Sequence, residues 1–311
     1  MRRMGERQTA DAVLLVRPAA FGFHAEAAAS NAFAVHNPDS GVRAKAIGEF
    51  DRLARRLDDA GVEVLVLDDR AEPGKPDAVF PNNWVSFHAD GTMALYPMAT
   101  ERRRLERETT QVTQLLEKQG FEVRRTIDLS AHEQHGHFLE GTGSLILDRP
   151  HRRALANRSV RTHPDVVAAF DTALGYDTHL FDAADDAGQP IYHTNVLLSL
   201  GTDWAILCTD AVAETDRAGL AAAIRDGGRE LVEVGFEQMR GFCCNILELR
   251  SSTGGPVIAL SHSALQALSA EQRRTLERFA TLADVHVPTI EAVGGGSVRC
   301  MIAEIHLPRA G

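Results

Sequence analysis

The stretch Ala12-Val13-Leu14-Leu15-Val16 is an apolar run with the length and composition of one buried β-strand. It comes before the first segment with helical periodicity, residues 43–57. Three short strands are expected after each of the first four helical segments. After the last helical segment only two are expected, at 285–287 and 300–307. We therefore predict that the N-terminal strand completes the last unit and closes a ring, which removes exposed sheet edges.

Helical periodicity and short apolar strands alternate along the whole chain. Five helices are expected, at residues 43–57, 102–118, 164–174, 215–225 and 264–280, and their starts lie about 50 to 60 residues apart. This spacing predicts an α/β fold of five strand–hairpin–helix units around a pseudo-fivefold axis, in a single domain over residues 1–311. An open α/β sheet with incidental spacing is the alternative.

The composition excludes several classes of function. The 311 residues carry 33 Lys and Arg against 43 Asp and Glu, and the net charge of −10 argues against nucleic-acid binding. No apolar run approaches the roughly 18 residues of a membrane helix. Four cysteines do not make a disulfide framework, which favours free thiols and a cytoplasmic location. We expect a small-molecule partner, with neither nucleic acid nor membrane, and the sequence leaves formation of a homo-oligomer open.

The start of each expected hairpin is the place to look for chemistry, because equivalent positions in a ring of repeats point toward one centre. These starts read Phe80-Pro81-Asn82-Asn83-Trp84, Leu139-Glu140-Gly141-Thr142-Gly143, Tyr192-His193-Thr194-Asn195, Phe242-Cys243-Cys244-Asn245 and Gly294-Gly295-Gly296-Ser297-Val298-Arg299-Cys300. An acid, a histidine and a cysteine occupy matching positions and are flanked by amides. The pattern predicts one site that contains Glu140, His193 and Cys300.

Each of these three residues has a catalytic and a structural interpretation. Cys300 follows three glycines, which let a substrate approach the main chain and suit a nucleophilic thiolate; the other three cysteines are interpreted as structural. His193 would act as general acid and base, although a lone histidine is often structural. Glu140 lies in an apolar, glycine-bounded slot, where a carboxylate needs a partner. It could hold a substrate nitrogen, orient His193 or accept backbone hydrogen bonds.

Two further polar runs receive no catalytic role. His132, His135 and His137 could suggest zinc, but their spacing and the lack of a fourth ligand match no known site. We therefore predict no metal and place these histidines in a loop beside the active site. Residues 102–107 read Arg-Arg-Arg-Leu-Glu-Arg, and their mixed charges predict a solvated helix face.

The motifs around these residues resemble the guanidine-modifying superfamily, which includes arginine deiminases, agmatine deiminases, dimethylarginine hydrolases and amidinotransferases. The glycine-rich segment that ends in Cys300, the Glu140-Gly141 pair and the segment around His193 look like its catalytic motifs, and Ser159-Val160-Arg161-Thr162 resembles its Ser-x-Arg-Thr stretch. The resemblance implies a five-bladed α/β propeller, or pentein, fold without metal or organic cofactor. It also implies that Arg161 holds the α-carboxylate of the substrate.

Two positions depart from the deiminases, which usually have aspartates where this chain has Asn83 and Asn195. Aspartates pair with a cationic guanidinium, whereas asparagine offers an uncharged donor and acceptor. The change suits a neutral ureido group, and the pattern looks most like the citrulline-utilisation hydrolase branch. We expect hydrolysis of citrulline to ornithine, ammonia and carbon dioxide through a covalent Cys300 adduct, with Asn83 and Asn195 framing the ureido head. An arginine deiminase or dimethylarginine hydrolase, or a non-catalytic amino-acid-binding protein, are the alternatives.

Overall fold

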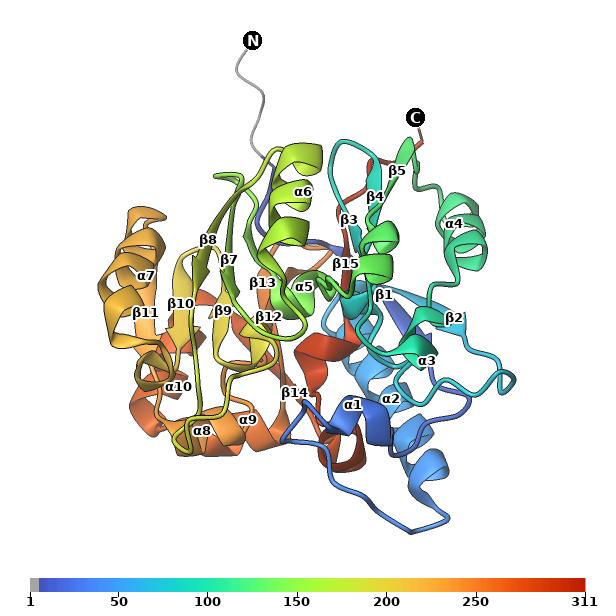
Figure 1. The fold of residues 1–311 in the computed structure, drawn as a ribbon, viewed down its shortest axis with the longest axis horizontal. Helices are drawn as coiled ribbons and strands as arrows, with labels where there is room; N and C mark the ends of the chain where they lie inside the picture. Colours follow the sequence, from blue (N-terminus) through green and yellow to red (C-terminus); the bar gives the residue numbers. More distant parts are fainter. Residues whose placement is uncertain (1–5, 311) are drawn as a thin grey trace.

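The computed structural model describes residues 6–310, which contain five three-stranded sheets with one shared topology (Figure 1). In each sheet the first two strands pair antiparallel, and the middle strand pairs parallel with the third. The sheets are β15 (Ala303–Ile305), β1 (Ala12–Arg17) and β2 (Glu63–Asp68); β3 (Val85–Phe87), β4 (Thr92–Leu95) and β5 (Arg125–Asp128); β6 (Ile146–Asp148), β7 (Arg153–Asn157) and β8 (Asp177–Phe181); β9 (Leu198–Leu200), β10 (Trp204–Leu207) and β11 (Glu230–Glu233); and β12 (Leu247–Arg250), β13 (Pro256–Ser261) and β14 (Thr281–Val285). The predicted mixed α/β class is confirmed.

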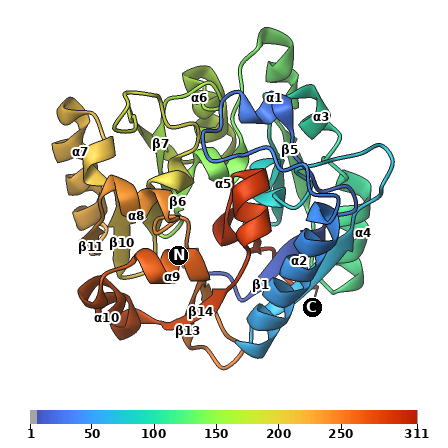
Figure 2. The same cartoon turned by 90° about the horizontal axis from the view of Figure 1, so that it is seen from below.

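A helical crossover joins each middle strand to its parallel neighbour, as parallel pairing requires. The crossover helices are α2 (Val42–Asp59), α3 (Glu101–Arg104) with α4 (Thr109–Lys118), α6 (Pro164–Leu174), α7 (Glu214–Asp226), and α9 (His262–Ala267) with α10 (Ala270–Phe279). Figure 2 shows α2, α4, α6, α7 and α10 on the outside of the molecule. The short helix α5 (Gly141–Ser144) and the red C-terminal helical segment lie toward the middle.

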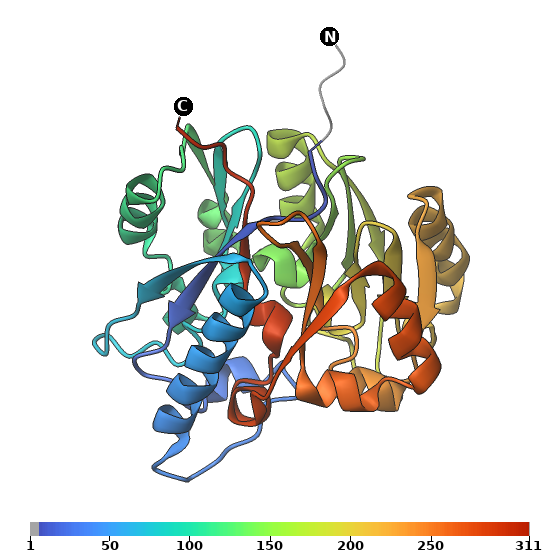
Figure 3. The same ribbon diagram turned by 180° about the vertical axis from the view of Figure 1, so that it is seen from behind.

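Strand β1 brings the two ends of the chain together, because it lies between β15 and β2 in one sheet (Figure 3). Val13 and Leu15 pack with the apolar face of α2, whereas Ala12 and Leu14 pack with the core around β3 and α4. Both faces of β1 are therefore buried. This is why the strand reads as a continuous apolar run and does not alternate with polar residues.

Two of the five predicted helices are interrupted in the structure. Helix 102–118 divides into α3 and α4, and at the break the Glu108 carboxylate binds Lys75 Nζ at 2.8 Å. Helix 264–280 divides at Ser269, which begins α10 with a capping box: the Ser269 hydroxyl accepts from Gln272 N, and the Gln272 side chain accepts from Ser269 N. The apolar periodicity continues across both breaks, so it did not reveal them.

Short helical turns precede the hairpins, at the segments that the sequence pattern identifies as hairpin starts. They are η1 (Pro81–Asn83), α5, η3 (Thr194–Val196) and η6 (Val298–Met301). In the fourth unit the chain turns at residues 241–244, where Phe242 has a φ of 63°, and strand β12 begins at Leu247. These turns carry Asn83, Asn195 and Cys300, and Glu140 and His193 directly precede α5 and η3.

Further short elements connect the units. Helices α1 (Ala25–Ala28) and α8 (Phe236–Arg240), with turns η2 (Ser130–His135), η4 (Thr209–Ala211) and η5 (Ile290–Gly294), complete the secondary structure of the described residues. Within residues 6–310, no helix has the length and apolar character of a membrane span.

Candidate active site

The turns that precede the hairpins meet at one small cavity. Thr142 Oγ1 in α5 donates to the Asn82 carbonyl of η1 at 3.4 Å, and Thr194 Oγ1 in η3 donates to the Ser144 carbonyl of α5 at 2.6 Å. The cavity is lined by Ala27, Asn31, Asp77, Phe80, Asn83, Arg103, Arg161, Tyr192, His193, Gly294, Gly295, Gly296 and Cys300. Four of the six predicted site residues are in this lining. The other two, Glu140 and Asn195, bond directly to members of it.

The Cys300 thiol faces two amide side chains. Asn195 Nδ2 and Asn245 Nδ2 donate to Cys300 Sγ at 3.4 and 3.2 Å. Hydrogen-bond donors in this position stabilise negative charge on sulfur. The glycines leave room for this arrangement, because a Cβ on Gly296 would lie 3.0 Å from the Phe80 ring and 3.3 Å from Cys300 Cβ.

Asn245 is not among the site residues predicted from the sequence. It is the fourth residue of the segment Phe242-Cys243-Cys244-Asn245, as Asn195 is of Tyr192-His193-Thr194-Asn195. That matching position in the repeat is the signal that could have identified it. Its Nδ2 also donates to the Asn195 carbonyl at 3.0 Å, which fixes the two amides relative to each other.

Glu140 and His193 form a buried pair. His193 Nε2 lies 2.9 Å from Glu140 Oε2, and Glu140 Oε1 accepts from the backbone N–H of Ala99 at 3.0 Å. Burial alone would raise the pKa of Glu140, but the charge of Arg161, the hydrogen bond from His193 and the charge of Arg103 hold it well below its usual value. Glu140 is therefore an ionised acceptor that orients the imidazole.

Burial has the opposite effect on the imidazole. It lowers the pKa of His193 to about 4, although the hydrogen bond and charge of Glu140 act to raise it. The ring is therefore neutral near pH 7, the form of imidazole that has a nitrogen able to accept a proton.

Arg161 is buried and is held from several sides. Its Nη1 donates to Glu140 Oε2 at 3.2 Å, and its Nη2 donates to the Ala27 carbonyl and to Ser30 Oγ, both at 2.7 Å. The guanidinium also lies over the Tyr192 ring, 5.0 Å from its centroid. A substrate carboxylate that binds Arg161 must therefore replace its contacts with the segment that contains Ala27 and Ser30.

The predicted solvated helix face at residues 102–107 is wrong for Arg103, which is buried. Its Nη1 donates to Asn83 Oδ1 at 2.9 Å and lies 3.5 Å from Glu140 Oε2, and its Nη2 is 3.0 Å from Glu106 Oε2. These carboxylates offset the desolvation of the cation. Asn83 and Glu140 are distant from Arg103 in sequence, so the local charge pattern could not reveal these contacts.

Asp77 is a second residue that was not predicted from the sequence. It lines the cavity, its Oδ2 lies 2.6 Å from His24 Nδ1, and Arg103 Nε lies 3.9 Å away. Asp77 follows Pro76 in a loop without periodicity, so the sequence pattern gives no signal for it. It adds a carboxylate to the lining of the cavity.

The cavity encloses about 20 Å³, room for about one water molecule. A larger hollow of about 520 Å³ shares Asn31 and Tyr192 with it and is otherwise lined by neighbouring residues such as Phe33, Val160 and Met239. An amino-acid substrate does not fit the small cavity as it stands. Entry from the hollow requires movement of the segment around Asn31, whose side chain donates to the Gly295 carbonyl at 3.3 Å.

The remaining cysteines are buried away from this cavity, within one apolar cluster. Burial raises the pKa of the Cys243 thiol to about 12 and also raises the pKa values of Cys208 and Cys244. These thiols stay protonated at neutral pH and are poor nucleophiles.

The fold and the site together define a member of the guanidine-modifying superfamily. The family model described as N,N dimethylarginine dimethylhydrolase, eukaryotic, matches residues 17–307. The chain therefore belongs to the N,N-dimethylarginine dimethylhydrolase family and is homologous to hydrolases that act on carbon–nitrogen bonds. A sequence search of the curated proteins finds no match.

Solved structures share the fold at low sequence identity. Apo ArgZ, an arginine dihydrolase from the cyanobacterial ornithine–ammonia cycle, matches with a TM-score of 0.74 and 16% identity over 96% of this chain and 41% of its own. The chain thus spans about two fifths of full-length ArgZ. A substrate-bound mutant of the ArgZ N-terminal domain gives a TM-score of 0.73 and 16% identity, over 95% of this chain and 99% of that domain. A mutant of dimethylarginine hydrolase from Pseudomonas aeruginosa, complexed with citrulline, matches with a TM-score of 0.65 and 14% identity. The match covers 96% of this chain and 100% of that one.

The lowered pKa of His193 predicts a loss of stability in acid. An exposed histidine titrates near 6.5, so the unfolded chain binds more protons than the folded chain as the pH falls from there toward 4. We expect the free energy of unfolding to fall between pH 7 and pH 4.5, with His193 contributing roughly 2–3 kcal/mol of the loss. Urea unfolding of His193→Asn should show a flatter dependence, and the exposed-site control His36→Asn should match the unmodified chain. Parallel curves for all three proteins would contradict the assignment of a neutral, buried His193.

Proposed function

We propose that this chain hydrolyses the ureido group of citrulline to give ornithine, ammonia and carbon dioxide. The proposal rests on two buried amide atoms that have no hydrogen-bond partner among the described residues. They are the donor Asn83 Nδ2 and the acceptor Asn195 Oδ1. A buried polar atom without a partner is destabilising unless a ligand satisfies it. A ureido carbonyl needs a donor and its nitrogens need acceptors, which is what these two atoms offer.

The proposed first half-reaction uses the thiol and the neutral imidazole. His193 accepts the proton of Cys300, and the thiolate attacks the ureido carbon, with charge on the adduct stabilised by the amides of Asn195 and Asn245. The imidazolium returns the proton to the ornithine nitrogen, and the bond between that nitrogen and the ureido carbon breaks. Ornithine leaves, and a carbamoyl group remains on sulfur.

The second half-reaction restores the enzyme. His193 removes a proton from water, which attacks the carbamoyl carbon, and the carbon–sulfur bond breaks. The thiolate takes up the proton from His193, and the released carbamate decomposes to ammonia and carbon dioxide. Glu140 stays ionised throughout and stabilises the imidazolium. These steps use side chains of the chain and one water molecule.

Two cavity residues fit the amino-acid end of the substrate. Arg161 would bind the α-carboxylate through paired N–H donors once the contacts with Ala27 and Ser30 are released. Asp77 would then receive the α-ammonium group, since it adds a carboxylate to the same cavity. Exchange of these contacts would couple substrate binding to movement of the segment that contains Ala27.

Arginine or an N-methylated arginine is the second candidate substrate. The family match and the fold shared with an arginine dihydrolase favour it, and Asp77 and Glu140 could pair with a guanidinium. The products separate the two candidates, because deimination of arginine forms citrulline and the proposed reaction consumes it.

We also propose that the five sheets are blades of a pentein propeller and that residues 6–310 form one domain. The shared sheet topology and the pairing of β1 with β15 support this arrangement. The free cysteines of the chain support a reducing, cytoplasmic location.

Replacement of the nucleophile tests the proposed function. The chain should form ornithine and ammonia from citrulline, and it should turn over arginine, dimethylarginine and agmatine more slowly. Cys300→Ser should lose at least about 10³-fold in kcat, because serine lacks the nucleophilicity of a thiolate. Cys208→Ser, a change at a buried thiol outside the cavity, controls for loss of a cysteine. Retained turnover in Cys300→Ser, or no ornithine from citrulline in the unmodified chain, would overturn the proposal.

A charge introduced at Asn83 tests substrate selection. Asn83→Asp removes the unpartnered donor and adds a carboxylate that suits a guanidinium. We expect kcat/KM for citrulline to fall by about tenfold or more, and the ratio of arginine to citrulline turnover to rise. Steady-state assays of both substrates measure this, with exposed Asn37→Asp as the control for the added charge. An unchanged ratio would show that Asn83 does not select the substrate head group.

A further inference from the structure

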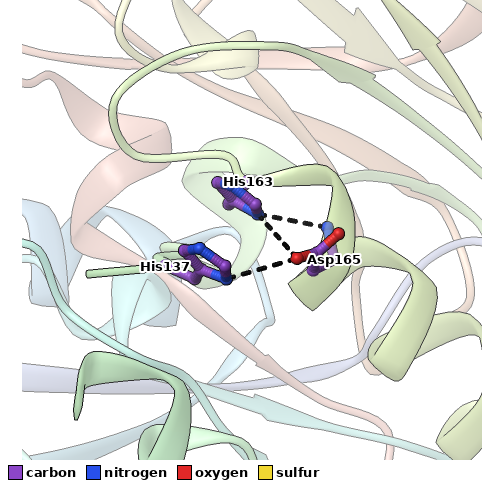
Figure 4. Close-up of side chains that lie close together, drawn as sticks. All are labelled: His137, His163 and Asp165. Carbon is purple, nitrogen blue, oxygen red and sulfur yellow. Dashed lines mark hydrogen bonds and ion pairs between the residues drawn. The ribbon is translucent and has the colours of Figure 1, made fainter. Parts of the chain in front are cut away.

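Two histidines and an aspartate form a compact group outside the cavity of the candidate active site (Figure 4). His137 Nδ1 lies 3.4 Å from Asp165 Oδ2, and His163 Nδ1 lies 3.8 Å from the same oxygen. One donor atom from each residue can be chosen so that all three lie within 4.8 Å of one another. The sequence motif grouped His137 with His132 and His135, whereas its partners here come from the start of α6.

We propose that His137, His163 and Asp165 bind one divalent transition-metal ion with the preferences of zinc. Two imidazole nitrogens and one carboxylate oxygen are ligands that Zn²⁺ favours. Ligands about 2.0–2.1 Å from a tetrahedral zinc lie roughly 3.3 Å apart, close to the two separations found here. Water can occupy the fourth position, or His135 can, since its ring centroid lies 6.2 Å from that of His137.

Metal binding requires a local rearrangement that the side chains allow. The His137 and His163 rings are stacked, with centroids 3.6 Å apart and planes 8° from parallel. A metal lies in the plane of each ring that binds it, so one ring must rotate, and the His137 side chain is 32% exposed. His163 Nδ1 accepts from the Asp165 backbone N–H at 3.2 Å, so a metal bound through this nitrogen replaces that N-cap hydrogen bond. The N-terminus of α6 carries a partial positive charge that disfavours a cation, and the negative charge of the Asp165 carboxylate compensates for it.

The position of the group connects it to two residues of the candidate active site. The His163 backbone N–H donates to the Phe138 carbonyl at 2.7 Å, and the Glu140 N–H donates to the Arg161 carbonyl at 3.2 Å. The segments that contain His137 and His163 are therefore paired where they lead to Glu140 and Arg161. A metal that joins the two histidines cross-links these segments and stabilises the folded state.

Calorimetric titration of the full, chelator-treated chain with ZnCl₂ tests the site. We expect one equivalent to bind, and a rise in Tm of about 2 °C or more at saturation. His137→Ala and His163→Asn should each weaken binding by about tenfold or more and abolish the Tm rise. Asparagine at 163 keeps an N-cap for α6, so that variant retains the helix start. The control His151→Ala changes a half-exposed histidine elsewhere and should bind zinc unchanged.

Zinc could instead bind the thiol of Cys300, and Cys300→Ala separates the two sites. Binding that survives in Cys300→Ala and is lost in His137→Ala supports the proposal, as does a Co²⁺ spectrum without a thiolate charge-transfer band. Binding that is lost in Cys300→Ala and retained in both histidine variants overturns it. Absence of a saturable equivalent in the unmodified chain also overturns it.

Discussion

The buried charge of Glu140 is the constraint on which the arrangement of the site depends. This carboxylate has no exposed surface, and such a charge is strongly destabilising unless donors surround it. His193, Arg161, Arg103 and the Ala99 amide supply those donors. Because these groups come from three different repeats of the chain, satisfying one carboxylate also fixes the imidazole and two guanidinium groups relative to the cavity.

The amides around the thiol follow a different principle. Asn195 and Asn245 occupy the same position in their two segments, and both donate to Cys300 Sγ. The sulfur of Cys300 is therefore contacted by uncharged amide dipoles and not by charged side chains. Such a site can stabilise an anionic adduct and still accept a neutral substrate head group. Of the two guanidinium groups in the cavity lining, that of Arg103 donates to Asn83, whereas that of Arg161 contacts Ala27 and Ser30.

Local regularities of the sequence predict the repeat well, and they predict Cys300, His193 and Glu140, because glycine runs and hairpin starts are local. They do not predict the helix breaks at residues 105–108 and at Ser269, where capping and long-range contacts override a continuous periodicity. The clearest failure of sequence-based prediction is Arg103. Its charged neighbours in the sequence predict an exposed side chain, whereas folding brings it into contact with Asn83 and Glu140. Pairing of His137 with His163 is invisible for the same reason.

A carbamoyl group on Cys300 is the most direct consequence of the proposed chemistry. The protein can be mixed rapidly with citrulline, quenched in acid and digested, and the peptides analysed by mass spectrometry. We expect the Cys300 peptide to gain the mass of one carbamoyl group during turnover and to lose it once citrulline is exhausted. The peptide with Cys243 and Cys244 should stay unmodified. Continued release of ornithine while the Cys300 peptide is unmodified at every quench time would contradict covalent catalysis by this thiol.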